Sequence, residues 1–92
     1  MQKITFFYLH YCPYCRKAEQ AFEELKQENP AYGAVEIDAY EETEHPYVVS
    51  RYDFYYAPTL YVGKEKIYEA HPGDDYGTIK AHVKKALEAA LA

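Results

Sequence analysis

The chain has 92 residues, which is the size of one small domain, and we expect residues 1–92 to form a single domain. Hydrophobic residues make up 49% and charged residues 27%, which is typical of a globular protein and excludes a disordered chain. The net charge of −5 argues against a nucleic-acid partner. The chain has no apolar run long enough to span a membrane and no signal-peptide pattern. We therefore expect a cytoplasmic protein that does not bind membranes, and we also expect a monomer.

The first half of the chain predicts a strand, a helix and a second strand. Residues 3–9 form a short, almost continuously apolar run, which is typical of a strand buried on both faces. Pro13 suits the first turn of a helix, and Pro30 and Gly33 end that helix. Residues 34–38 alternate as a second strand, so this unit predicts a parallel, right-handed βαβ connection.

The second half predicts a short helix, a hairpin and a long helix. Residues 44–46 resemble a helix start, and Pro58 limits how far that helix can run. Residues 59–62 and 66–70 predict a hairpin. Asp74 or Asp75 can cap the last helix, whose apolar face comprises Ile79, Val83, Ala86, Leu87 and Ala90. The order β-α-β-α-β-β-α predicts an α/β fold, with a mixed four-stranded sheet flanked by three helices on both of its faces.

Tyrosine is unusually frequent, with 12 copies and no tryptophan. Tyrosine favours strands and has a polar hydroxyl on an apolar ring. We therefore interpret most of these residues as half-buried cover of the sheet and helices, and not as an aromatic ligand site.

The informative motif is Cys12-Pro13-Tyr14-Cys15, between the first strand and the first helix. Unpaired N–H groups and the helix dipole stabilise an anion at the start of a helix, which lowers the pKa of Cys12. Cys12 can then attack a substrate disulfide, and Cys15, one turn further on, can release the product. Arg16 is placed either to keep the potential around Cys12 positive or to be ordinary helix surface.

A metal site is the competing interpretation of this motif. Two cysteines supply only two of the four ligands that zinc prefers, and the chain has no second pair. His10, His45 and His71 could complete a site, but Pro13 fixes the loop for a helix start. We therefore predict no bound metal. His10, two residues before Cys12, either influences the thiolate or faces solvent.

The tetrapeptide Cys12-Pro13-Tyr14-Cys15 resembles the active site of dithiol glutaredoxins, and the whole chain resembles the thioredoxin-like fold. The resemblance implies that Pro58 forms a cis peptide bond beside the active-site loop. It also implies that the backbone at Ala57 pairs with the substrate as an added strand. We expect substrate binding at Tyr14, Ala57, Pro58, Gly73, Asp74 and Asp75, and at Arg16 through its charge.

Several positions depart from the glutaredoxin pattern. Leu9 replaces the usual lysine, Tyr56-Ala57 replaces Thr-Val, and His71-Pro72 replaces a Gly-Gly pair. Asp74 and Asp75 preserve an acidic helix start that would hold the amino end of glutathione, although helix capping alone also explains these two acids. These departures leave open whether glutathione is the electron donor.

The predicted function is a thiol–disulfide oxidoreductase that reduces protein or glutathione mixed disulfides through Cys12 and Cys15. It would use no bound cofactor, with glutathione or a thioredoxin reductase as the donor of electrons. The resemblance implies a reduction potential of roughly −200 to −230 mV. Two alternatives remain: a thioredoxin-like reductase of protein disulfides that a reductase serves, or a non-catalytic binding module with a redox latch.

Overall fold

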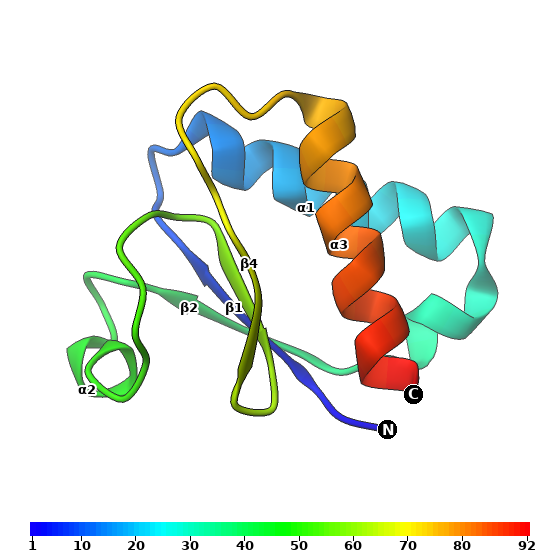
Figure 1. The fold of residues 1–92 in the computed structure, drawn as a ribbon, viewed down its shortest axis with the longest axis horizontal. Coiled ribbons are helices and arrows are strands. Elements are labelled where there is room, and N and C mark those ends of the chain that lie inside the picture. The colour runs from blue at the N-terminus through cyan, green and yellow to red at the C-terminus, as the bar shows by residue number, and fades with distance from the viewer.

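The computed structural model describes residues 1–92 as one mixed sheet with helices around it (Figure 1). The elements are β1 (Ile4–Tyr8), α1 (Pro13–Glu28), the 3₁₀ helix η1 (Pro30–Ala34), β2 (Ile37–Glu41), α2 (Pro46–Val49), β3 (Thr59–Val62), β4 (Glu65–Glu69) and α3 (Tyr76–Leu91). The strand order is β2-β1-β3-β4, with β1 and β2 parallel and the other pairs antiparallel. The predicted element order and mixed sheet are confirmed. None of the helices has both the length and the apolar character that crossing a membrane requires.

Helices α1 and α3 pack side by side over one face of the sheet. The predicted stripe of α3 is buried in full, and so is the stripe of α1 that includes Phe22. Both stripes meet Ile4, Phe6 and Leu60 of the sheet in one core. This core fixes the start of α1 at the end of β1.

The other face of the sheet is covered mainly by aromatic side chains. The centre of the Phe7 ring lies 4.5–6.3 Å from the ring centres of four neighbours, which are Tyr40, Tyr52, Phe54 and Tyr61. Helix α2 has a single turn and no buried residue. The interpretation of tyrosine as sheet cover is therefore confirmed for this cluster, whereas the prediction that helices cover both faces is only partly right.

The second strand begins later than the sequence predicts. Residues 30–34 form η1, which buries Tyr32, and the Asn29 side chain caps it by accepting from the Ala31 N–H at 3.1 Å. The chain therefore pairs with β1 only from Ile37 onward, so the prediction of residues 34–38 was wrong by three residues. The apolar alternation at residues 34–38 reflects the burial of Val35 after η1.

Candidate active site

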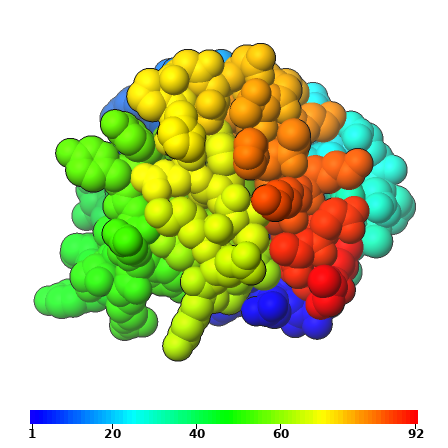
Figure 2. Space-filling view, in the orientation of Figure 1, coloured from blue at the N-terminus to red at the C-terminus, as the bar shows by residue number.

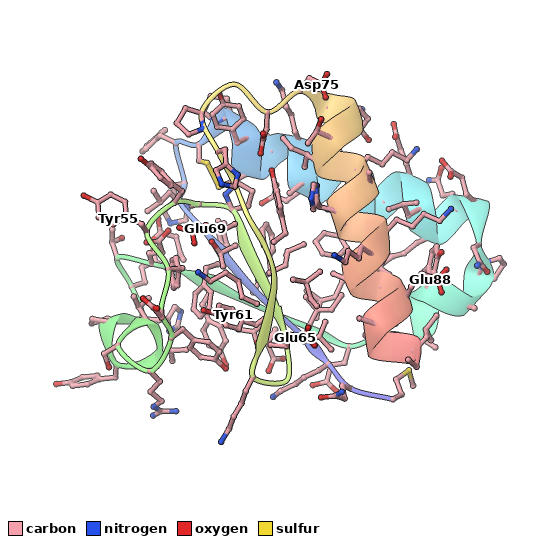
Figure 3. All side chains as sticks on the ribbon, viewed as in Figure 1. Tyr55, Tyr61, Glu65, Glu69, Asp75 and Glu88 are labelled. Carbon is pink, nitrogen blue, oxygen red and sulfur yellow. A yellow bond between two sulfur atoms is a disulfide. The ribbon has the colours of Figure 1, made fainter.

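Cys12 and Cys15 lie at the start of α1 and are joined by a disulfide, with 5.1 Å between their Cα atoms. Figure 3 shows this bond in yellow where α1 begins. Pro13 occupies the first turn of α1, and Cys12 is the N-cap with extended backbone. The sequence therefore folds locally as predicted, because the proline ring suits the first turn of a helix.

The two sulfur atoms have different environments. Cys15 is fully buried, whereas Cys12 is partly exposed. The Cys15 N–H donates to Cys12 Sγ at 3.1 Å. This amide lies in the first turn of α1, where the N–H groups have no carbonyl partner within the helix. A hydrogen bond of this kind and the helix dipole both favour negative charge on Cys12 once the disulfide is reduced.

The chain before β3 passes beside Cys12. The Ala57–Pro58 peptide bond is cis, as the resemblance implies, and the Ala57 carbonyl oxygen lies 3.8 Å from Cys12 Sγ. The Pro58 carbonyl accepts from the Ala70 N–H at 3.0 Å, but no group of the chain accepts from the Ala57 N–H. The Ala57 N–H is thus unpaired, and the Ala57 carbonyl has only the Cys12 sulfur beside it.

Tyr14 connects the cysteine motif to the loop before α3. Its hydroxyl accepts a hydrogen bond from the Gly73 N–H at 2.8 Å, and Lys17 Nζ lies 5.5 Å from the centre of its ring. Gly73 has a φ of +93°, a backbone conformation that favours glycine. Two of the predicted site residues, 59 positions apart, are therefore in direct contact.

Both aspartates at the start of α3 are bonded within the chain. Asp75 is the N-cap and accepts from the Thr78 N–H at 2.8 Å, which lowers the pKa of its carboxyl. Asp74 accepts from the Tyr68 hydroxyl at 2.5 Å and from the His71 N–H at 3.0 Å, and these bonds lower its pKa in turn. This arrangement accounts for both acids as parts of the local structure.

Arg16 contacts the end of β1 and the next turn of its own helix. Its guanidinium donates to the Leu9 carbonyl at 3.4 Å, pairs with Glu19 at 3.0 Å and lies 5.8 Å from the centre of the Tyr8 ring. Both roles of Arg16 that the sequence allows, an effect on the potential around Cys12 and ordinary helix surface, stay predictions.

His10 belongs to an acidic cluster that the sequence analysis did not foresee. Its Nε2 lies 2.8 Å from Glu44, and this bond raises its pKa. The buried Glu41 accepts from the His10 N–H at 3.0 Å and from the amide and hydroxyl of Thr43, and the Thr43 bonds lower the pKa of Glu41. Ligand atoms of His10, Glu41 and Glu44 lie within 4.8 Å of one another, but those of Glu41 already accept hydrogen bonds.

A shallow pocket of about 320 Å³ opens beside this cluster and next to the cysteine motif. It is lined by Leu9, His10, Tyr11, Glu41 and Thr43. Sequence reasoning also missed Glu69, whose carboxylate binds two backbone amides of the segment before Pro58. No local pattern marks this residue, because its partners are 13 and 14 positions away.

Comparison with known proteins places this geometry in a family. The family model of glutaredoxin matches residues 4–67. The fold is similar to the structure of a malarial protein, with 16% identity and a TM-score of 0.59 over 91% of this chain and 94% of that one. It is also similar to human ERp44 in its zinc-bound form, with 19% identity and a TM-score of 0.54 over 90% of this chain and 25% of that one.

No curated protein sequence matches the chain at a significant level. The structural likenesses show a thioredoxin-like fold, and the family match covers both cysteines and Pro58 but ends before the loop that carries Gly73. The chain belongs to the glutaredoxin family.

Proposed function

We propose that the protein is a dithiol oxidoreductase that reduces protein disulfides, with Cys12 as the nucleophile and Cys15 as the resolving thiol. The observation that carries this proposal is the difference between the two sulfur atoms. Cys12 is partly exposed and accepts an amide hydrogen bond at the start of α1, whereas Cys15 is fully buried. A substrate can therefore reach Cys12 first.

The reaction proceeds in two exchanges. The Cys12 thiolate attacks one sulfur of the substrate disulfide, which forms a mixed disulfide and releases the other substrate sulfur as a thiolate. Cys15 loses its proton and attacks Cys12 Sγ, which forms the Cys12–Cys15 disulfide and releases the second substrate thiolate. Two electrons pass to the substrate, and a donor must return two electrons to the protein.

The unpaired N–H of Ala57 supports an extended protein segment as the substrate. The Ala57 carbonyl oxygen lies 3.8 Å from Cys12 Sγ and the Ala57 N–H has no partner, so this residue can pair with a chain that crosses the sulfur. Glutathione is a weaker candidate. Its expected partners at the start of α3 already bond within the chain, since Gly73 donates to Tyr14, Asp74 binds Tyr68 and Asp75 caps α3.

Two donors suit this reaction: glutathione and a thioredoxin reductase. A reduction potential in the glutaredoxin range is within reach of a cytosolic glutathione pool, so energetics permit either donor. Both donors are consistent with the cytoplasm, which we propose as the compartment. Recognition favours the reductase, because the apolar Leu9 offers no cation to a glutathione carboxylate. We therefore propose weak turnover of glutathione mixed disulfides and faster turnover of protein disulfides.

A side-by-side assay tests this function. The wild type is supplied with a glutathionylated substrate plus glutathione, and separately with a protein disulfide plus a thioredoxin reductase. We expect faster turnover in the second assay and none in either assay with Cys12→Ser. Fast, saturable turnover with glutathione alone would contradict the substrate preference. No turnover in either assay would contradict the enzymatic proposal and favour a redox-latched binding module.

A further inference from the structure

The carboxylate of Glu69 binds the segment that leads to Pro58. Its Oε2 accepts from the Tyr55 N–H at 2.7 Å and from the Tyr56 N–H at 2.8 Å. Its Oε1 accepts from Lys66 Nζ at 2.8 Å. Figure 3 labels Glu69 on β4 and Tyr55 on the neighbouring segment, and Figure 2 shows the two segments side by side in yellow and green.

Apart from the Phe54 ring, which stacks on Phe7 with 4.5 Å between the ring centres, this segment is held by few hydrogen bonds. Residues 53–58 belong to no helix or strand, and the Tyr55 side chain is 85% exposed. Two side-chain hydroxyls help at the ends: Thr59 donates to the Tyr56 carbonyl at 2.5 Å and Tyr61 donates to the Asp53 carbonyl at 2.7 Å. Between these ends, the Glu69 carboxylate supplies one acceptor for two consecutive amides that no strand pairs.

The charge of Glu69 suits this task. Burial alone would raise its pKa, but the bonds from Lys66 and from the Tyr56 and Tyr55 amides lower the pKa overall, so the carboxylate stays ionised at neutral pH. Hydrogen bonds to an ionised acceptor are stronger than those between neutral groups. One side chain thus fixes two successive peptide units.

The residue after Tyr56 is Ala57, whose carbonyl oxygen lies 3.8 Å from Cys12 Sγ. A substrate segment would pair with the Ala57 backbone. The orientation of that backbone depends on the two peptide units before it, because they are joined to it directly. We infer that Glu69 is a positioning residue for protein substrates. By fixing the Tyr55 and Tyr56 amides, it holds the Ala57 backbone in the orientation that a substrate segment would pair with. This inference rests on the function proposed above.

The test compares Glu69→Ala, Glu69→Gln and a matched control, Glu65→Gln, which changes an exposed acid at the other end of β4. The assay with a protein disulfide gives KM and kcat, and amide hydrogen exchange reports on Tyr55 and Tyr56. We expect Glu69→Ala to raise KM about tenfold, with a smaller change in kcat and faster exchange at both amides. Glu69→Gln keeps an acceptor oxygen and should recover part of the loss, while Glu65→Gln should match the wild type.

The reaction of reduced Cys12 with a small alkylating reagent should be unchanged in all three variants, because the chemistry of the thiol does not involve Glu69. An active wild type together with an unchanged KM in both Glu69 variants would overturn the inference and leave the proposed function intact. An inactive wild type would overturn the proposed function, and the positioning role with it. If Glu69→Ala does not fold, the KM and amide exchange of Glu69→Gln decide the question.

Discussion

The Tyr14 hydroxyl accepts a hydrogen bond from the Gly73 N–H at 2.8 Å, and this bond joins the cysteine motif to the loop before α3. The same amide belongs to the loop where the family resemblance would place one end of glutathione. This contact therefore supports the local structure and occupies an amide of Gly73, which the resemblance assigns to substrate binding.

Replacing Tyr14 with phenylalanine should separate these two effects. The variant loses one hydrogen bond, so we expect the free energy of unfolding to fall by about 0.5–1.5 kcal/mol. The freed Gly73 amide should also raise the rate with a glutathione mixed disulfide relative to the rate with a protein disulfide. Denaturant unfolding and the two rates measure this, with Tyr11→Phe as control because Tyr11 is 99% exposed. An unchanged rate ratio would show that the bond does not restrict glutathione.

The helix start should make Cys12 acidic. In Cys15→Ser, we expect the Cys12 thiol to have a pKa clearly below the roughly 8.5 of an ordinary thiol, because an amide and the helix dipole favour its anion. Thiolate absorbance followed against pH measures this directly. Cys12→Ser is the control, in which the buried Cys15 should ionise only at higher pH. Equal titration of the two variants would contradict the assigned roles.

The aromatic face of the sheet should contribute to stability as a true core. Phe7 is fully buried among four rings, so Phe7→Ala should lower the free energy of unfolding by about 3–5 kcal/mol. Denaturant unfolding measures the change. Tyr47→Ala is the control, since this ring is 82% exposed and should change stability by only about 0.5 kcal/mol or less. A loss at Phe7 as small as that at Tyr47 would mean that the aromatic cluster is only loosely packed.

Acid should weaken the contact between α1 and α3. The Glu24 carboxylate accepts from the Tyr76 hydroxyl, from Gln20 and from Lys80 Nζ, which lowers its pKa from 4.5 to about 2. A lowered pKa in the folded state gives stability that is present above the unfolded pKa and is lost as the pH falls toward 2. Glu24→Gln should therefore be less stable than the wild type at pH 7, and the difference should shrink by pH 3.

Unfolding curves at the two pH values test this point, with Glu23→Gln as the control on the exposed side of α1. A difference between wild type and Glu24→Gln that stays constant from pH 7 to pH 3 would contradict the account, because it would mean that the charge of Glu24 does not matter.

Local patterns in the sequence were sufficient for the helices and the redox motif. The stripes that contain Phe22 and Val83 follow helical spacing, and Pro13 marks the start of α1, so each could be read from neighbouring residues. The strand β2 could not be placed correctly, because Val35 is buried directly after η1 and its apolar side chain resembles the start of strand alternation.

The parts of the site that depend on distant partners could not be predicted. Tyr14 and Gly73 are 59 positions apart, and Glu69 binds an irregular segment with no periodic pattern. The partners of Arg16 were equally hidden, since an exposed arginine on a helix can reach several groups. For these contacts the fold had to be known first.

The most direct test of the account is the trapping of a mixed disulfide. Reduced Cys15→Ser and reduced Cys12→Ser are each mixed with a protein disulfide, and the adducts are measured by mass spectrometry after separation without reductant. The account predicts a stable adduct on Cys12 in Cys15→Ser and none in Cys12→Ser, because Cys12 is partly exposed at the helix start whereas Cys15 is fully buried. Equal adducts in both variants, or none in Cys15→Ser, would contradict it.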